Sequence, residues 1–186
     1  SAAMSEPRGP VYLSLPREAL AEPWTTPGPV ASCRLPAATS PAPDPKALAE
    51  AAAILGRAKR PLIIAGRGDA SGFEVLPGFA ETSGIPVVHF WPARLAIPTD
   101  HPMHAGFDVS PWIEQADAIL VLDTMVPWLP ARHRIADGAK IIHVGPDPAF
   151  HRVPMRSFPG DLFIRAGVAE TVRQLGSAMA GSPGLS

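Results

Sequence analysis

The sequence predicts an α/β fold: a Rossmann-like parallel sheet of about six strands with helices on both faces. One observation is that short runs of Val, Ile, Leu and Ala recur without polar alternation, as in residues 62–65 and 118–122. A second is that helix-forming segments, such as residues 46–59, separate several of these runs. Continuously apolar strands that alternate with helices are typical of a parallel sheet covered on both faces.

Capping and punctuation residues predict where the elements begin and end. Asp44 can cap a helix that starts at Pro45 and continues to Lys59. Pro77 should kink or split a second helix at residues 72–82, because proline lacks the N–H that a helix interior needs. The other expected elements are strands at residues 62–65, 85–90, 116–123, 139–144 and 161–164, a short helix at 111–115 and a closing helix at 167–180.

The N-terminal segment does not fit this alternating pattern. Val11, Leu13 and Leu15 alternate with more polar residues, which predicts a half-buried strand. No partner strand is evident next to it, because the stretch from Pro23 to Pro45 carries seven prolines and has neither helical nor strand periodicity. This stretch is typical of an extended, semi-rigid linker.

Composition excludes several classes of partner. A net charge of −1 over 186 residues gives no electrostatic footprint for nucleic acid or an anionic membrane. The apolar runs are far too short to span a bilayer, and the N-terminus lacks the order of a signal peptide. Cys33 is the only cysteine, which fits a reducing compartment. We therefore expect a cytoplasmic protein that binds neither nucleic acid nor membrane.

The stretch LIIAGRGDASG contains the most suggestive local motif. Gly66 and Gly68 follow a strand and precede a helix, where backbone amides can approach a phosphate. In a dinucleotide fingerprint the third glycine would come one residue before Gly72, and the next strand ends His89-Phe90-Trp91 without an acidic residue for a ribose. These departures disfavour a nicotinamide oxidoreductase. Two interpretations stay open: a nucleotide-binding loop, or a glycine-rich turn with no ligand.

No group of residues predicts an active site or a metal site in this chain. No serine lies in a G-x-S-x-G motif, and His101 and His104 have no cysteine or paired carboxylate nearby to complete a metal site. In a parallel sheet the ligand crevice lies beyond the carboxyl ends of the strands. The loops of interest are therefore residues 66–68, 91–108, 123–128 and 145–150.

Seven segments follow one another between Gly9 and Leu175: GPVYLSLPREA, AKRPLIIAGRG, ETSGIPVVHF, AIPTDHPMHAGF, QADAILVLD, AKIIHVGPDPAF and FPGDLFI with its closing helix. The chain that carries them resembles the central domain of thiamine-diphosphate (ThDP)-dependent enzymes of the acetolactate synthase (acetohydroxyacid synthase) type, and the first segment resembles the end of that family's pyrimidine-binding domain. The resemblance implies that residues 1–22 end a pyrimidine-binding domain that is missing, that 23–44 form a linker, and that 45–181 form the central Rossmann-like domain.

The resemblance also implies what the parent enzyme does. It would use ThDP and Mg²⁺ to decarboxylate a 2-keto acid, followed by carboligation or release of the aldehyde, as a transferase or lyase. The pyrimidine- and pyrophosphate-binding domains of the same chain would be partners of this domain, and the full-length enzyme would be a dimer or tetramer. This chain lacks the family's Gly-Asp-Gly…Asn motif: Gly68-Asp69-Ala70 lacks the second glycine, and there is no Asn. We therefore expect the chain alone to be inactive.

In some relatives the central domain binds FAD or an adenine nucleotide. By resemblance the contacts here would be Gly66, Arg67, Gly68, Met103, His104, Gly106, Asp123 and Asp147. Two departures favour a scaffold without nucleotide: Asp123-Thr124-Met125-Val126 replaces Gly-Ala-Arg-Phe, and Gly145-Pro146-Asp147 replaces Asp-Ile-Asp. The alternative to the whole interpretation is a free-standing nucleotide-binding Rossmann-like module.

Overall fold

The computed structural model describes residues 3–6, 8–23, 36–151, 153–154 and 158–180. The chain divides into two units, Ser1–Ser40 and Pro41–Ser186. The predicted domain boundaries at residues 22, 44 and 181 remain predictions, and Cys33 lies outside the described residues.

The first unit has little regular structure in its described part. Its one helix there is α1 (Arg17–Ala21), whose residues are all exposed. Residues 9–15 form no strand, and Tyr12 is 91% exposed. The period-2 pattern therefore has no partner ladder within the described residues. Within the described part of this unit, the hydroxyl of Ser40 donates to Glu6 Oε2 at 3.0 Å.

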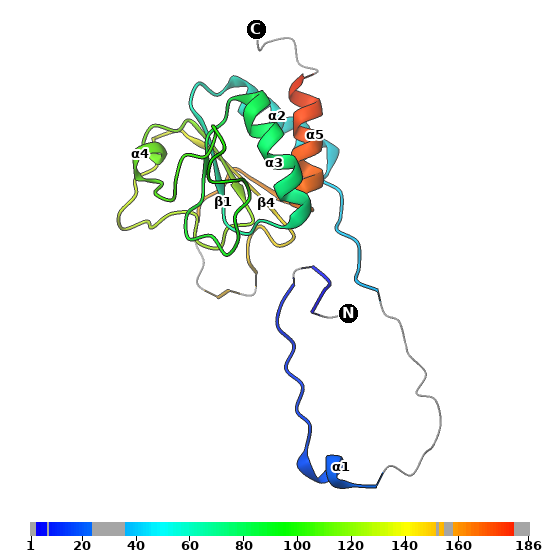
Figure 1. Ribbon diagram of the computed structural model, residues 1–186. Helices are drawn as coiled ribbons and strands as arrows, with labels where there is room; N and C mark the ends of the chain where they lie inside the picture. The colour runs from blue at the N-terminus through cyan, green and yellow to red at the C-terminus, as the bar shows by residue number, and fades with distance from the viewer. Residues whose placement is uncertain (1–2, 7, 24–35, 152, 155–157, 181–186) are drawn as a thin grey trace. The chain divides into compact units, whose positions relative to one another are not determined.

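The second unit is built on a parallel sheet of five strands in the order β2-β1-β3-β4-β5 (Figure 1). The expected count was about six. Residues 103–106 supply a shorter addition, because an isolated parallel bridge joins Val87 to His104 along the outer edge of β2. The strands are β1 (Pro61–Ala65), β2 (Val87–Val88), β3 (Ala118–Leu122), β4 (Lys140–Gly145) and β5 (Leu162–Arg165).

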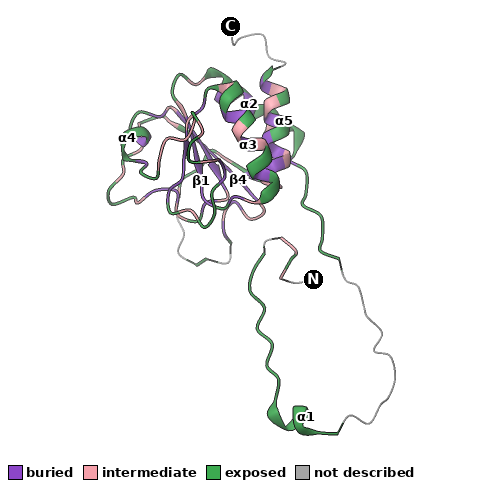
Figure 2. Cartoon of the chain, viewed as in Figure 1, coloured by how far each residue is buried: buried purple, intermediate pink, exposed green. Residues whose placement is uncertain are grey.

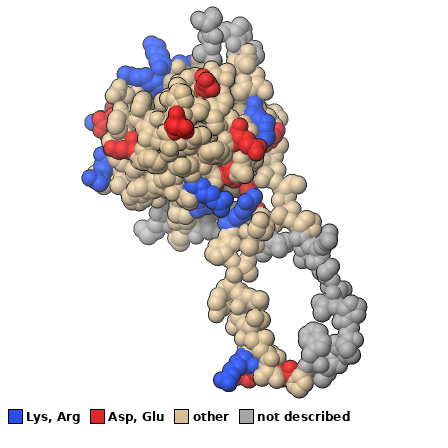
Figure 3. All heavy atoms as spheres, in the orientation of Figure 1, with Lys and Arg blue, Asp and Glu red and all other residues tan. Residues whose placement is uncertain are grey.

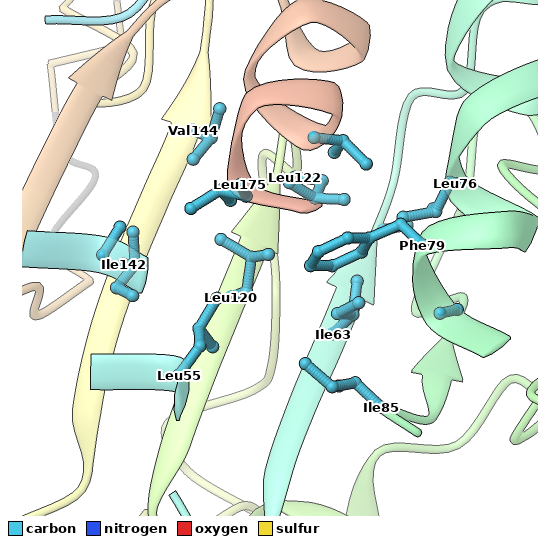
Figure 4. Close-up of a cluster of buried hydrophobic side chains, with 14 of the residues drawn as sticks. Leu55, Ile63, Leu76, Phe79, Ile85, Leu120, Leu122, Ile142, Val144 and Leu175 are labelled. Atoms are coloured by element: carbon cyan, nitrogen blue, oxygen red, sulfur yellow. The ribbon is translucent and has the colours of Figure 1, made fainter. Parts of the chain in front are cut away.

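Three helices cover one face of the sheet: α2 (Pro45–Arg57), α3 (Ala70–Ser83) and α5 (Val168–Ala180). Their apolar residues pack against alternate strand residues such as Ile63 and Leu120, as Figure 4 shows. The predicted cap is confirmed, since Asp44 Oδ1 accepts the N–H of Ala47 at 2.9 Å. Pro77 does not split the second helix, because α3 continues from Ala70 to Ser83, and the alternative, a kink, remains a prediction.

The opposite face is covered mainly by irregular chain. Its one helix is α4 (Ser110–Ile113), and the connections on either side of β3 supply buried side chains such as Phe90, Val109 and Trp128. Trp128 is 2% exposed and meets Phe158 edge-on. Figure 2 shows the buried strands between these two layers. Helices therefore lie on both faces as predicted, but they are unequally divided.

Candidate functional site

The strand order places the candidate site at the carboxyl ends of β1 and β3. From β1 the chain goes first to β2 on one side and later to β3 on the other side. Ligands of such sheets bind at this topological switch point. Gly66 follows β1 and Asp123 follows β3, and Gly66 donates its N–H to Leu122 O across the switch point.

Close packing explains both glycines of the turn after β1. A Cβ on Gly66 would lie 2.8 Å from Thr124 Oγ1, and a Cβ on Gly68 would lie 2.0 Å from the carbonyl oxygen of Leu95. The second contact is impossible without moving backbone. Residues 93–96, which follow β2, therefore lie directly against the turn, and the glycines are needed for this approach whether or not a ligand binds.

The turn as folded does not fit a phosphate. The N–H of Gly66 is used by Leu122, and the N–H of Gly68 donates to Arg94 O at 3.3 Å. The N-terminus of α3 is capped by Asp69, whose Oδ1 accepts the N–H of Gly72 at 2.6 Å. Free amides and a positive helix end are what phosphate binding requires. Here a carboxylate already takes that position.

Asp123 adopts a left-handed conformation at the end of β3. Its φ is 39°, which is uncommon for a residue other than glycine. Its N–H donates to Val144 O at 2.8 Å, and Gly145 lies so close that a Cβ there would be 3.4 Å from Asp123 Oδ1. Thr124 is buried beside it and donates its hydroxyl to Leu122 O at 2.9 Å. This corner is held by backbone pairing across β3 and β4.

Asp147 lies beyond the end of β4 and is paired with an exposed histidine. Its Oδ1 is 2.7 Å from His151 Nδ1, and its Oδ2 accepts the His151 N–H at 3.0 Å. Burial opposes its ionisation, but the hydrogen bonds from His151 outweigh this, and the pKa of Asp147 is lowered. Near the same edge the guanidinium of Arg67 lies 5.3 Å from the ring centroid of Phe150.

Met103, His104 and Gly106 lie along the outer edge of β2. Met103 and Gly106 contribute carbonyl oxygens that accept from Val87 and His89. The predicted contact residues therefore form two groups: Gly66, Arg67, Gly68, Asp123 and Asp147 at the ends of β1, β3 and β4, and Met103, His104 and Gly106 beside β2. That any of them contacts a nucleotide remains a prediction.

His89 links the two groups, and the sequence interpretation did not select it. It is fully buried, and its Nε2 accepts the N–H of Ala96 at 2.9 Å. Its ring centroid is 5.1 Å from that of His104. Burial and the charge of His104 lower the pKa of His89 to about 4. The available signal was a histidine inside the apolar run IPVVHF.

The surface charges do not define a single type of ligand. Acidic and basic side chains are interspersed on the face that Figure 3 draws. Among the described residues no group of three or more His, Cys, Asp and Glu side chains is placed to hold a metal ion. Within the same part of the chain, no helix is both long and apolar enough to cross a membrane.

The family model described as "Thiamine pyrophosphate enzyme, central domain" matches residues 48–175. The chain belongs to this family. The match covers all five strands, all of α3 and most of α2 and α5, so the predicted resemblance to ThDP-dependent enzymes is confirmed. The central domain described above is thus the part of these enzymes that the chain represents.

Similar proteins extend well beyond this central domain. The chain is 30% identical over 180 residues to the Pseudomonas aeruginosa PAO1 protein named "Probable 2-ketoarginine decarboxylase AruI", covering 92% of the chain and 31% of that protein. It is 29% identical to acetolactate synthase 1, chloroplastic, of Zea mays, covering 76% of the chain and 24% of the relative. The benzoylformate decarboxylase structure from Polynucleobacter necessarius aligns with a TM-score of 0.71 at 25% identity, covering 95% and 34% of the two chains. The chain therefore spans about a third or less of each.

Proposed function

We propose that the chain is the non-catalytic central domain of a cytoplasmic ThDP- and Mg²⁺-dependent enzyme that decarboxylates a 2-keto acid. The observation that carries the proposal is the central-domain match over residues 48–175. Two of the similar proteins are named decarboxylases of 2-keto acids, 2-ketoarginine and benzoylformate. The third, acetolactate synthase, is named for the product of a carboligation.

The role of the domain would be to position its neighbours. Ser110 Oγ lies 3.2 Å from His133 Nε2, but this hydroxyl donates to Asp108 Oδ1 and the His133 Nδ1 atom accepts from Leu129, so the pair is not an activated nucleophile. The tightly paired turns of the domain are instead suited to a rigid scaffold between the pyrimidine- and pyrophosphate-binding domains, in a full-length dimer or tetramer. ThDP would supply the carbanion chemistry in those domains when bound.

The test is turnover of 2-keto acids by the native full-length protein. Pyruvate, benzoylformate and 2-ketoarginine are supplied with and without ThDP and Mg²⁺, and CO₂ release is measured. We expect release that requires ThDP, with the 186-residue chain inactive as the matched control. Analysis of the second product separates an aldehyde-releasing lyase from an acetolactate-synthase-like transferase. CO₂ release at the same rate with and without ThDP, or no release from any of the three 2-keto acids, would contradict the proposal.

A second candidate role is nucleotide binding at the carboxyl edge. Arg67, Arg165 and His151 place cationic or hydrogen-bonding groups near the ends of β1, β5 and β4, which favours an anionic ligand. The occupied amides of Gly66 and Gly68 oppose it. FAD, ADP and CoA at about 100 times Kd should stabilise the chain by about 2.7 kcal/mol, because they would bind only the native state. A melting temperature that none of the three raises excludes this role and also the free-standing module.

A further inference from the structure

His89 has a backbone role that fixes its position beside β2. Its N–H donates to Gly106 O at 3.0 Å, and its side chain is fully buried. The neighbouring bonds from Val87 to Met103 and from Ala105 to Val87 continue the same pairing. The ring of His89 is therefore held in the interior, against the rings of His104 and Phe107.

The hydrogen bond from Ala96 fixes the protonation state of His89. A backbone N–H can only donate, so the Nε2 atom that receives it at 2.9 Å must carry no proton. His89 is then neutral, with its proton on Nδ1. A second proton on Nε2 would face the Ala96 N–H and break this bond.

His104 is the titratable side chain whose ring faces His89. The ring centroids are 5.1 Å apart, and Phe107 contacts both rings. His89 Nδ1 and His104 Nε2 are buried, and neither has a hydrogen-bond partner among the described residues. A second proton on His89 would place a positive charge in this buried contact, where neither ring supplies a counter-charge.

His89 forms hydrogen bonds to two separate segments, residues 93–96 and residues 103–106. Through Ala96 it holds residues 93–96, whose Ala93 donates to Gly66 O at 2.7 Å and whose Arg94 accepts from Gly68. Through Gly106 it holds residues 103–106 on the edge of β2. Protonation of the His89 ring would break the bond from Ala96, whereas the bond to Gly106 comes from the backbone N–H of His89 and does not depend on the ring.

We propose that His89, packed on the ring of His104, is an acid-sensitive latch, which holds residues 93–96 against the turn after β1 while the His89 ring is neutral and releases them when that ring is protonated. The latch does not depend on the reaction proposed above, because it uses only contacts within this domain. The lowered pKa of His89 agrees with it, since the folded state resists the proton that the open state accepts.

Histidine-detected NMR and amide exchange on the 186-residue chain test the latch. At about pH 7 the spectra should show His89 protonated on Nδ1 alone. Between about pH 7 and pH 5 the Ala96 amide should exchange about twentyfold faster, after correction for intrinsic rates, because the open state gains the proton at pH 6.5 and the latched state only near 4. A proton on Nε2 at neutral pH overturns the proposal.

Two variants separate the latch from general acid effects. His104→Gln removes the facing charge, so the acid-dependent increase at Ala96 should be smaller than in the wild-type chain. His151→Gln, at an exposed histidine on another edge, should leave the increase unchanged. Equal increases in the wild-type chain and His104→Gln overturn the pairing. His89→Phe should expose the Ala96 amide at all pH values. If His89→Phe does not fold, the comparison of His104→Gln with the wild-type chain decides the test.

Discussion

The two faces of the sheet are buried to the same extent but are covered by different kinds of structure. Three helices with regular apolar stripes cover the first face, and its residues Ile63, Leu120 and Leu175 are completely buried. On the second face one short helix and irregular connections cover Ile64 and Ile119 just as completely. Complete burial thus does not require regular elements, provided that large side chains such as Trp128 fill the space.

The difference matters because every candidate site residue comes from connections and not from the covering helices. Asp123, directly after β3, and Trp91, three residues after β2, take left-handed φ values of 39° and 47°. Such residues persist only where the surrounding packing holds them. Regular elements build the frame, and the connections at the carboxyl edge carry the conformations that a site can use.

The largest expected effect tests whether the irregular face is a true core. Trp128→Ala should lower the free energy of unfolding by about 3–5 kcal/mol, because it removes a buried ring packed on Phe158. Leu175→Ala on the helical face should cost about 2–5 kcal/mol. Urea unfolding measures both. Trp112→Ala, at a partly exposed ring on α4, is the control and should cost about 1 kcal/mol or less. If Trp128→Ala costs no more than this control, the irregular face is not a packed core.

The next largest effect is the pH dependence of the free energy of unfolding that His89, beside β2, should produce. The folded pKa of His89, about 4, lies below its ordinary 6.5, so its stabilising contribution is complete above pH 6.5 and is lost as the pH falls toward 4. One such group changes the free energy of unfolding by at most about 3 kcal/mol over that range. His89→Leu should flatten the curve of unfolding free energy against pH. Parallel curves for the two proteins would show that His89 contributes nothing.

A smaller effect distinguishes glycines needed for packing from glycines that are not. Gly68→Ala forces residues 93–96 away from the turn and should cost about 1–3 kcal/mol. Gly56→Ala lies in the last turn of α2 with open space around its Cβ, so it should stabilise the chain by up to about 1 kcal/mol. Thermal unfolding of the two variants compares them directly, and equal signs would refute the packing explanation for Gly68.

The smallest effect concerns the start of the helical face. Asp44→Ala removes the cap of α2 and should cost about 1 kcal/mol. Asp137→Ala removes a carboxylate whose ion pair with Arg134 is almost fully exposed, so no measurable change is expected. Chemical denaturation of both variants checks the difference, which disappears if the cap contributes nothing to the helical face.

Most element positions could be predicted because their signals are local. Asp44 before Pro45 marks the start of α2, and the apolar runs mark β1, β3 and β4 to within two residues. The strand expected at residues 85–90 was too long, since only Val87 and Val88 form β2. Pro86 has no N–H to contribute to a ladder. The chain beyond Val88 turns instead toward residues 93–96 and 103–106, which no local pattern indicates.

By itself the sequence determined the α/β class, the cap of α2 and the resemblance to the central domain of ThDP-dependent enzymes, because these depend on residue types at fixed spacings. It left open whether Gly66 and Gly68 serve a phosphate or a close contact, and it gave His89 no role. The tertiary structure adds the close approach of Leu95 to Gly68 and the hydrogen bond from Ala96 to His89. Such contacts join residues from separate turns, and their geometry exists only once the sheet has brought the strand ends together.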